Sequence, residues 1–236
     1  MKVKFFDKER IVELSAIEIS NKFKRLKKIP VLLLLSGGSA IEMYNYIDPF
    51  VLYPSLTFAV LDERYSTDPQ VNNFAQITKT KLFMEGQKNG VNSIDTRVND
   101  LATQKQVTIK FEKDLRNWKE DNINGLVISI MGIGSDGHIA GIMPIPEDLE
   151  KFSNLFEKNN WVVGYDTENR IPFRYRVTTT LTFLKNEIDY SYVFISDVNK
   201  KDITKKALEK NKSLNEIPAR VICQMKNVEL LTCVKL

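Results

Sequence analysis

The sequence predicts an α/β fold with an open, mainly parallel sheet and helices on both of its faces. The continuous apolar run at residues 31–35 and the mainly apolar runs at 56–61 and 126–131 are typical of strands buried on both sides. Segments with helical spacing lie between these runs, and each run ends in a polar or glycine-rich turn. Buried strands that alternate with helices form a parallel sheet covered on both faces.

The remaining elements follow from local patterns in chain order. In residues 8–27 the apolar side chains Ile11, Leu14 and Phe23 fall on one stripe, which predicts a helix after a short strand over 3–6. Further helices are expected over 40–46, 72–83, 104–119, 147–156 and 200–210, and further strands over 161–164, 192–196 and 228–234.

Composition limits the classes of protein to which the chain can belong. It has 236 residues with 34 Lys+Arg and 30 Asp+Glu, a net charge of +4, and ordinary globular hydrophobicity. This charge is too mild, and the lysines too evenly spread, to indicate nucleic-acid binding. No repeat or linker divides the chain, so we expect one domain over residues 1–236.

Several other classes are excluded by simple counts. Cys223 and Cys233 have no zinc-motif spacing, and they suggest a reducing, cytoplasmic location. The longest apolar run, 29–35, is far short of the ~20 residues of a membrane span, and no signal peptide is predicted. His138 is the only histidine, so any histidine chemistry must use that residue.

The first polar turn has the composition of a phosphate-binding loop. Ser36, Gly37, Gly38 and Ser39 follow a buried strand and precede a predicted helix. Glycines let the backbone approach a ligand, and hydroxyls and free N–H groups can donate to an anion. The Gly-Lys-Ser/Thr ending of a P-loop is absent, and an ordinary tight turn with Ser39 as helix cap is the structural alternative.

The second polar turn, Asp62-Glu63-Arg64, directly follows the strand at 56–61. An arginine fork matches phosphate or carboxylate groups, so these residues would suit a cleft. A surface cluster of ion pairs is the alternative.

The third turn carries the candidate for acid–base chemistry. Residues 132–137 match the Gly-x-Gly-x-x-Gly dinucleotide fingerprint, but Pro144 follows soon after and no acidic strand end comes at the right distance. A dehydrogenase is therefore disfavoured. Asp136 and His138 lie in the same turn, where a carboxylate can orient the imidazole as a general base. A serine nucleophile is disfavoured because no Gly-x-Ser-x-Gly elbow is present.

Read in order, these segments resemble the 6-phosphogluconolactonase family, within the superfamily of sugar-phosphate isomerases and deaminases. Segment 35–39 is similar to the family's Ser-Gly-Gly-Ser/Thr loop, segment 61–64 to its Asp-Glu-Arg motif, and 132–140 to its Gly-x-Gly-x-Asp-Gly-His signature. Asn72-Asn73, Arg176 to Leu181 and Pro218-Ala219 resemble three later family segments.

The resemblance implies a sugar-phosphate isomerase/deaminase-like fold and hydrolysis of 6-phospho-D-glucono-1,5-lactone, a step of the pentose phosphate pathway, without a metal or organic cofactor. It implies that His138 is the general base, that Asp136 holds it and that Arg64 stabilises negative charge. No nucleic-acid or membrane partner is expected, only a small-molecule substrate, and the protein is expected to be a monomer or a small homo-oligomer. The substrate and its phosphate would be bound by Ser36, Gly37, Gly38, Ser39, Asp62, Asn73, Arg170 and Arg176.

The sequence departs from the family pattern at the phosphate site, and it leaves two other functions open. The family's lysine before the Arg-Val-Thr segment has no clean match, and Arg170, Arg174 or Arg176 would have to replace it. Glucosamine-6-phosphate deaminases have a glutamate where this chain has Met143, so the lactonase is favoured. A sugar-phosphate-binding regulator without turnover is the non-enzymatic alternative.

Overall fold

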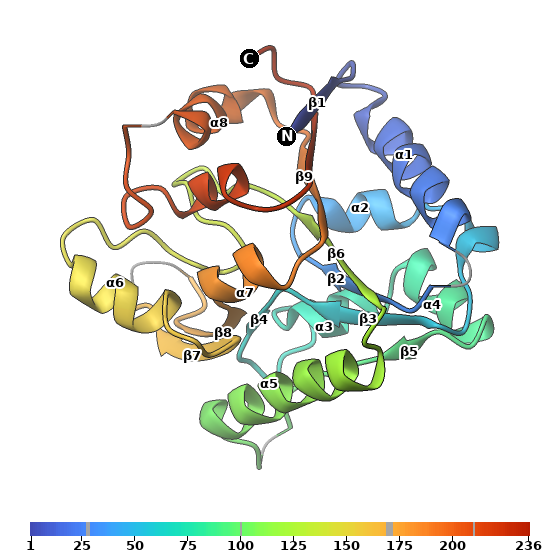
Figure 1. Cartoon of the computed structure of the whole chain (residues 1–236), viewed down its shortest axis with the longest axis horizontal. Coiled ribbons are helices and arrows are strands. Elements are labelled where there is room, and N and C mark those ends of the chain that lie inside the picture. The colour runs from blue at the N-terminus through green and yellow to red at the C-terminus, as the bar shows by residue number, and fades with distance from the viewer. Residues whose placement is uncertain (27–28, 100, 169–171, 210) are drawn as a thin grey trace.

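In the computed structural model a seven-stranded sheet, parallel throughout, runs through the molecule (Figure 1). The structure describes residues 1–26, 29–99, 101–168, 172–209 and 211–236. The strand order is β1 (Lys2–Phe5), β10 (Val228–Thr232), β9 (Tyr190–Ile195), β6 (Leu126–Met131), β2 (Val31–Leu35), β3 (Leu56–Val60) and β5 (Asn92–Ser93). This sheet confirms the predicted fold class.

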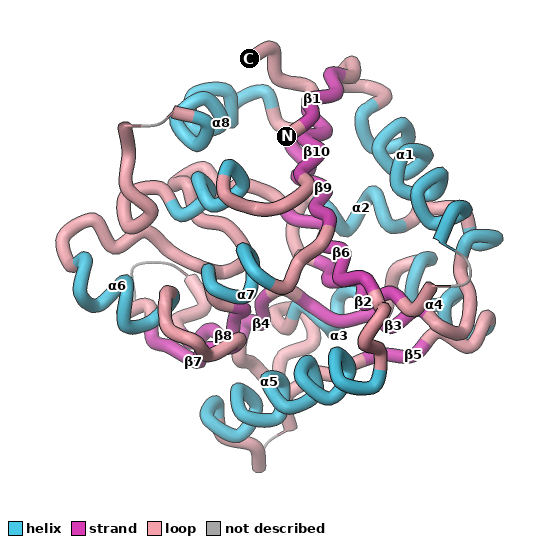
Figure 2. The backbone as a smooth tube through the Cα atoms, in the orientation of Figure 1, coloured by secondary structure: helices cyan, strands magenta, loops and turns pink. Residues whose placement is uncertain are grey.

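Helices cover both faces of the sheet because its central strands are apolar on both sides. In Figures 1 and 2, α1 and α2 lie on one side, and α7 and α8 lie on the other. The helices are α1 (Ile11–Leu26), α2 (Ala40–Tyr44), α3 (Asn73–Ile77), α4 (Lys81–Lys88), α5 (Gln104–Asp121), α6 (Leu149–Phe156), α7 (Leu181–Asn186) and α8 (Lys201–Leu208), with 3₁₀ turns at Pro49–Val51, Val198–Lys200 and Pro218–Cys223.

A second sheet, which was not predicted, holds part of the candidate site. It is three-stranded and antiparallel, in the order β4 (Asp62–Arg64), β8 (Tyr175–Thr179) and β7 (Val162–Asp166). Its register pairs Arg64 with Arg176 and Glu63 with Val177. Helix α5 packs against β7 and β8. The polar segment after β3 is therefore a strand that β8 holds in place, rather than a simple turn.

The predicted helix over 72–83 is two helices, so that prediction was wrong in its continuity. Helix α3 ends at Ile77, and Thr80 begins α4 as its N-cap by accepting a hydrogen bond from the Phe83 N–H. Thr80 also donates through its hydroxyl to the carbonyl of Ile77, at 2.7 Å. A threonine cap satisfies the free N–H groups of a new helix and so favours a break at this point.

The polar turns of the sequence meet because their strands are neighbours. β9, β6, β2 and β3 are consecutive in the sheet and parallel, so their carboxyl ends lie along one edge. Ligands of open α/β sheets bind at that edge. Within the described ranges, no helix has the length and apolar character that crossing a bilayer requires.

Candidate active site

A cavity of about 310 Å³ opens beyond the carboxyl ends of the four central strands. Nine of the predicted site residues line it: Ser36, Gly37, Gly38, Ser39, Asp62, Arg64, Asn73, His138 and Arg176. Gly132 to Ser135, Ala140, Gly141 and Lys200 complete the described lining. Three segments that are far apart in the sequence thus form one site, as the strand-end argument predicts.

His138 and Asp136 form a hydrogen-bonded pair beside this cavity. The Asp136 Oδ1 atom lies 2.6 Å from Nδ1 of His138 and 3.1 Å from its backbone nitrogen. Burial alone would raise the pKa of Asp136, but the hydrogen bonds and charge of His138 outweigh it, and the pKa is lowered. The charged carboxylate can only accept, so in the neutral imidazole Nδ1 carries the proton and Nε2 keeps the lone pair.

The turn that presents His138 is backed by the C-terminal part of the chain. The Gly137 carbonyl accepts a hydrogen bond from the Ala219 N–H at 2.9 Å, within the 3₁₀ turn Pro218–Cys223. Gly134 donates its N–H to the His138 carbonyl at 2.9 Å, which closes the turn on itself. The Pro218-Ala219 pair of the sequence therefore supports the His138 turn from behind.

Gly134 leaves the space that the His138 ring occupies, which predicts the effect of a substitution. A Cβ atom at Gly134 would lie 2.1 Å from His138 Nδ1 and 2.7 Å from Asp136 Oδ1. Gly134→Ala should therefore displace the ring and lower kcat by at least about 100-fold, the lower end of what a general base contributes. Gly132→Ala is the matched control, because the nearest atom to its Cβ would be 3.6 Å away. Steady-state kinetics of both variants, with circular dichroism to check folding, would decide; equal activities would contradict the steric argument.

The buried Tyr44 side chain fixes the start of the loop 36–39 by hydrogen bonds to the backbone of Ser36. The hydroxyl of Tyr44, in α2, donates to the Ser36 carbonyl at 2.8 Å and accepts from the Ser36 N–H at 3.1 Å. Burial raises the pKa of Tyr44 far above its ordinary value, so the hydroxyl keeps its proton. The Ser39 side chain makes no capping hydrogen bond to α2, although Ser39 occupies the N-cap position. Its hydroxyl is therefore available to a ligand in the cavity.

The opposite wall of the cavity combines two arginines with one carboxylate. Arg176 Nη1 lies 3.5 Å from Asp62 Oδ2. Arg64, on β4, is the cross-strand neighbour of Arg176 on β8. Burial, and next the charge of Arg176, lower the pKa of Arg64. Several buried atoms here have no hydrogen-bond partner among the described residues, namely Arg64 Nε, Arg176 Nε, Ser36 Oγ and Asn73 Oδ1. Buried polar groups are normally paired, so these unpaired atoms distinguish the polar wall of the cavity from the apolar core.

Glu63 lies behind this wall and does not face the cavity. Its side chain is fully buried and accepts from the N–H groups of Asn73 (2.5 Å) and Phe74 (3.0 Å) and from the Thr96 hydroxyl (2.9 Å). Burial raises the pKa of Glu63 to about 8, although these hydrogen bonds favour the carboxylate. Glu63 therefore ties the start of α3, and with it Asn73, to β4.

Lys200 is a cavity residue that sequence reasoning missed. It follows β9 in the 3₁₀ turn Val198–Lys200, and its Nζ donates to the Ile133 carbonyl at 2.6 Å. Burial lowers the pKa of Lys200 from its ordinary value. With Lys200 the described lining contains three permanent or protonated cations (the others are Arg64 and Arg176) and one carboxylate, Asp62. The site is therefore built for an anion.

Two of the proposed phosphate-binding arginines are not brought to the cavity by the described structure. Arg174 donates to both carboxylate oxygens of Asp166 and is not among the lining residues. Arg170 lies outside the described residues. Arg176 is thus the only one of the three that the structure places in the site.

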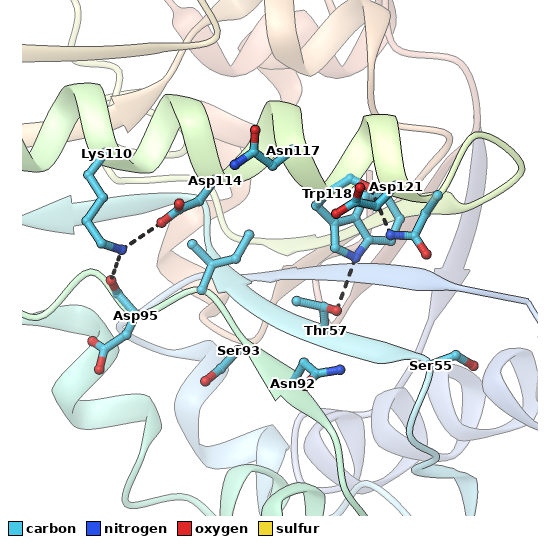
Figure 3. Close-up of a pocket in the computed structure, with 12 residues that line it drawn as sticks. Ser55, Thr57, Asn92, Ser93, Asp95, Lys110, Asp114, Asn117, Trp118 and Asp121 are labelled. Carbon is cyan, nitrogen blue, oxygen red and sulfur yellow. Dashed lines mark hydrogen bonds and ion pairs between the residues drawn. The ribbon is translucent and has the colours of Figure 1, made fainter.

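Among the further hollows of the described residues are two that lie outside this site. One, about 350 Å³ in volume, borders Asp136 and Met143. Figure 3 shows the other, about 540 Å³, between α5 and the β3/β5 edge of the sheet. There Lys110 pairs with Asp114, and Trp118 Nε1 donates to Thr57 Oγ1. None of the predicted site residues lies in the hollow of Figure 3, and no metal-binding group of His, Cys, Asp or Glu is found in the described part of the chain.

Known proteins resemble this chain in sequence and in fold. A curated protein of Dictyostelium discoideum, named probable 6-phosphogluconolactonase, is 24% identical over 199 residues, covering 83% of this chain and 81% of the relative. A 6-phosphogluconolactonase structure from Thermotoga maritima is 22% identical, with a TM-score of 0.75 over 99% of both chains. One from Plasmodium vivax has a TM-score of 0.74 at 22% identity, covering 98% of this chain and 90% of that one.

The fold of these solved structures is therefore the fold of this chain. The model of the family described as glucosamine-6-phosphate isomerases/6-phosphogluconolactonase matches residues 7–232, nearly the whole sequence. The resemblance read from the three strand-end motifs is thereby confirmed, and the chain belongs to the glucosamine-6-phosphate isomerase/6-phosphogluconolactonase family.

Proposed function

We propose that this protein hydrolyses 6-phospho-D-glucono-1,5-lactone to 6-phosphogluconate, a step of the oxidative pentose phosphate pathway. The observation that carries the proposal is the His138–Asp136 pair, with 2.6 Å between Nδ1 and Oδ1, beside a cavity with three cations and one carboxylate. A carboxylate-oriented imidazole is a base for water, and surplus positive charge suits a phosphorylated substrate. The names of the relatives above support the same reaction.

His138 starts the reaction as a general base. Its Nε2 takes a proton from a water molecule, whose oxygen attacks the lactone carbonyl carbon and forms a tetrahedral oxyanion. The intermediate collapses by breaking the bond to the ring oxygen, which takes up the proton from His138. The products are a hydroxyl group and a carboxylic acid, which loses its proton at neutral pH. Asp136 holds the imidazole in the required tautomer and stabilises its charged form.

The cations divide between the reacting carbon and the phosphate. Arg64 lines the cavity and would stabilise the oxyanion, which is the largest electrostatic demand of acyl transfer. The loop Ser36 to Ser39, Arg176 and Lys200 would bind the phosphate through hydroxyl, backbone and charged donors. Binding at this remote group orients the lactone for attack.

The deaminase alternative needs a second acid beside the histidine. Met143 stands at the position of the deaminase glutamate; it is buried and borders the adjacent hollow rather than the cavity of His138. Asp62 is the one carboxylate in the described lining, and it faces Arg176. We therefore favour the lactonase over the deaminase.

The test is proton release on adding freshly generated 6-phosphogluconolactone to the purified protein in weak buffer with a chelator. The rate is read against spontaneous hydrolysis and against 1,5-gluconolactone, which lacks the phosphate. Rapid release with the phosphorylated lactone supports the proposal. No acceleration rejects it and turns attention to ammonia release from glucosamine 6-phosphate, and then to ligand binding without turnover. The expected cytoplasmic location, the single domain over residues 1–236 and the oligomeric state stay predictions.

Removing the charge of Lys200 should weaken substrate binding more than turnover. Lys200→Gln keeps a donor for the Ile133 carbonyl but loses the cation, so we expect KM to rise about tenfold with a small change in kcat. The neighbouring Lys201, which is exposed and does not line the cavity, is the matched control as Lys201→Gln. Initial-rate kinetics at two salt concentrations measure both. A KM equal to that of the wild type would contradict a role in phosphate binding.

A further inference from the structure

The ring of Phe173 covers the guanidinium of Arg64. The Cζ atom of Arg64 lies 4.8 Å from the ring centroid, within the range of a cation–π contact. Phe173 precedes β8 and is 43% exposed, so its ring does not belong to the apolar core. No carboxylate of the described residues forms an ion pair with the Arg64 side chain, and its Nε has no hydrogen-bond partner there.

The backbone at Phe173 is strained in a way that places this ring. Its φ is +66°, a left-handed conformation that costs a residue with a Cβ atom about 1–2 kcal/mol. The next residues are fixed: the Arg174 carbonyl accepts from the Thr167 N–H at 2.9 Å, and the Tyr175 carbonyl accepts from the Tyr65 N–H at 3.0 Å. Strain of this kind persists where the surroundings impose it, and it is concentrated at functional sites.

An aromatic ring and a carboxylate hold an arginine side chain in different ways. A carboxylate would neutralise the guanidinium and occupy its in-plane donors, whereas a ring attracts it through its face and leaves all five N–H groups free. The charge of Arg176 repels Arg64, and the charges of Asp62 and Glu63 attract it without an ion pair to its side chain among the described residues. The ring of Phe173 contacts the guanidinium directly and leaves its charge and donors free.

We propose that Phe173 is a positioning residue, which holds Arg64 toward the cavity while keeping the charge and donors of Arg64 available to the developing oxyanion. The inference rests on the proposed lactonase function. It concerns a side chain that does not line the cavity and acts through Arg64.

Four variants test this inference by kinetics of lactone hydrolysis. Phe173→Leu keeps an apolar side chain without the π face, and Phe173→Asn removes the ring but suits the left-handed backbone. Both should lower kcat about fivefold to twentyfold with little change in KM, the loss expected for a partly desolvated cation–π contact acting in the transition state. Phe173→Tyr should restore activity to within twofold. Tyr175→Leu, an equally exposed aromatic of the same segment, should leave kcat unchanged.

A double-mutant cycle separates positioning from a purely structural role. In an Arg64→Gln background, Phe173→Leu should have no further effect on kcat, because the group that it positions is gone. Wild-type kcat in both Phe173→Leu and Phe173→Asn would overturn the inference alone, as would an undiminished effect in the Arg64→Gln background. If the wild-type protein does not accelerate lactone hydrolysis, the proposed function fails and this inference falls with it.

Discussion

Replacing His138 by Ala or Asn should lower kcat for lactone hydrolysis by about 10²–10⁴-fold, the contribution of a positioned general base. No other imidazole exists in the chain to take its place. His138 is 37% exposed at its side chain, so the substitution should cost little stability. Proton release above the spontaneous rate measures the loss. Binding of 6-phosphogluconate, followed by calorimetry, should survive because the phosphate donors remain.

Asp136→Asn is the graded control for this prediction. The amide cannot stabilise a charged imidazole, and it can turn its NH₂ group toward Nδ1 and so favour the wrong tautomer. We expect a kcat between that of the wild type and that of the His138 variants. The pH profile adds a second readout, since activity that depends on an uncharged imidazole falls toward acid pH. Normal turnover in His138→Ala would remove the general-base role of His138.

The polar turns predicted from the sequence meet at one cavity because parallel strands end at a common edge. The runs 31–35 and 126–131 coincide with β2 and β6, and their glycine-rich turns meet at the cavity. The same rule could have found Lys200, which stands four residues beyond the strand predicted over 192–196. It was missed because the segment 197–200 has no glycine and no family motif to mark it.

The features that the sequence could not predict depend on pairing between strands that are far apart in the chain. β4 consists of three polar residues, and no hydrophobic pattern marks it as a strand. It is a strand because β8, more than a hundred residues later in the sequence, supplies its partners. The contact of Phe173 with Arg64 and the burial of Glu63 both follow from this small sheet. Local sequence patterns carry no information on such contacts. β-propensity does not supply it either, because it depends strongly on the surrounding structure.

The buried carboxyl group of Glu63 should have the largest effect on stability. Glu63→Leu would leave the N–H groups of Asn73 and Phe74 and the Thr96 hydroxyl without an acceptor inside the protein. Each orphaned donor costs about 1–3 kcal/mol, so the free energy of unfolding should fall by about 3 kcal/mol or more. Urea unfolding followed by fluorescence measures the change. Glu63→Gln keeps one acceptor oxygen and should cost about 1–2 kcal/mol at pH 7.

The pH dependence of this stability has a defined sign. Burial raises the pKa of Glu63 to about 8 in the folded protein, against an ordinary value near 4.5. Between these values the folded state keeps a proton that the unfolded chain releases, so the free energy of unfolding falls as pH rises. The contribution of Glu63 is complete below about pH 4.5 and is lost by about pH 8, at up to roughly 1.4 kcal/mol per pH unit.

Glu63→Gln isolates this contribution, because glutamine matches the protonated carboxyl in shape and does not titrate. Lowered-pKa groups such as Asp136 act in the opposite direction at acid pH, but they are present in both proteins and cancel in the difference. We expect the stability gap between wild type and Glu63→Gln to shrink as pH rises from 5 to 8. A gap that stays constant over that range would mean that the hydrogen bonds from α3 keep Glu63 ionised. Glu63 would then be a charged anchor for Asn73 beneath an arginine pair, and the net positive charge around the cavity would be smaller by one.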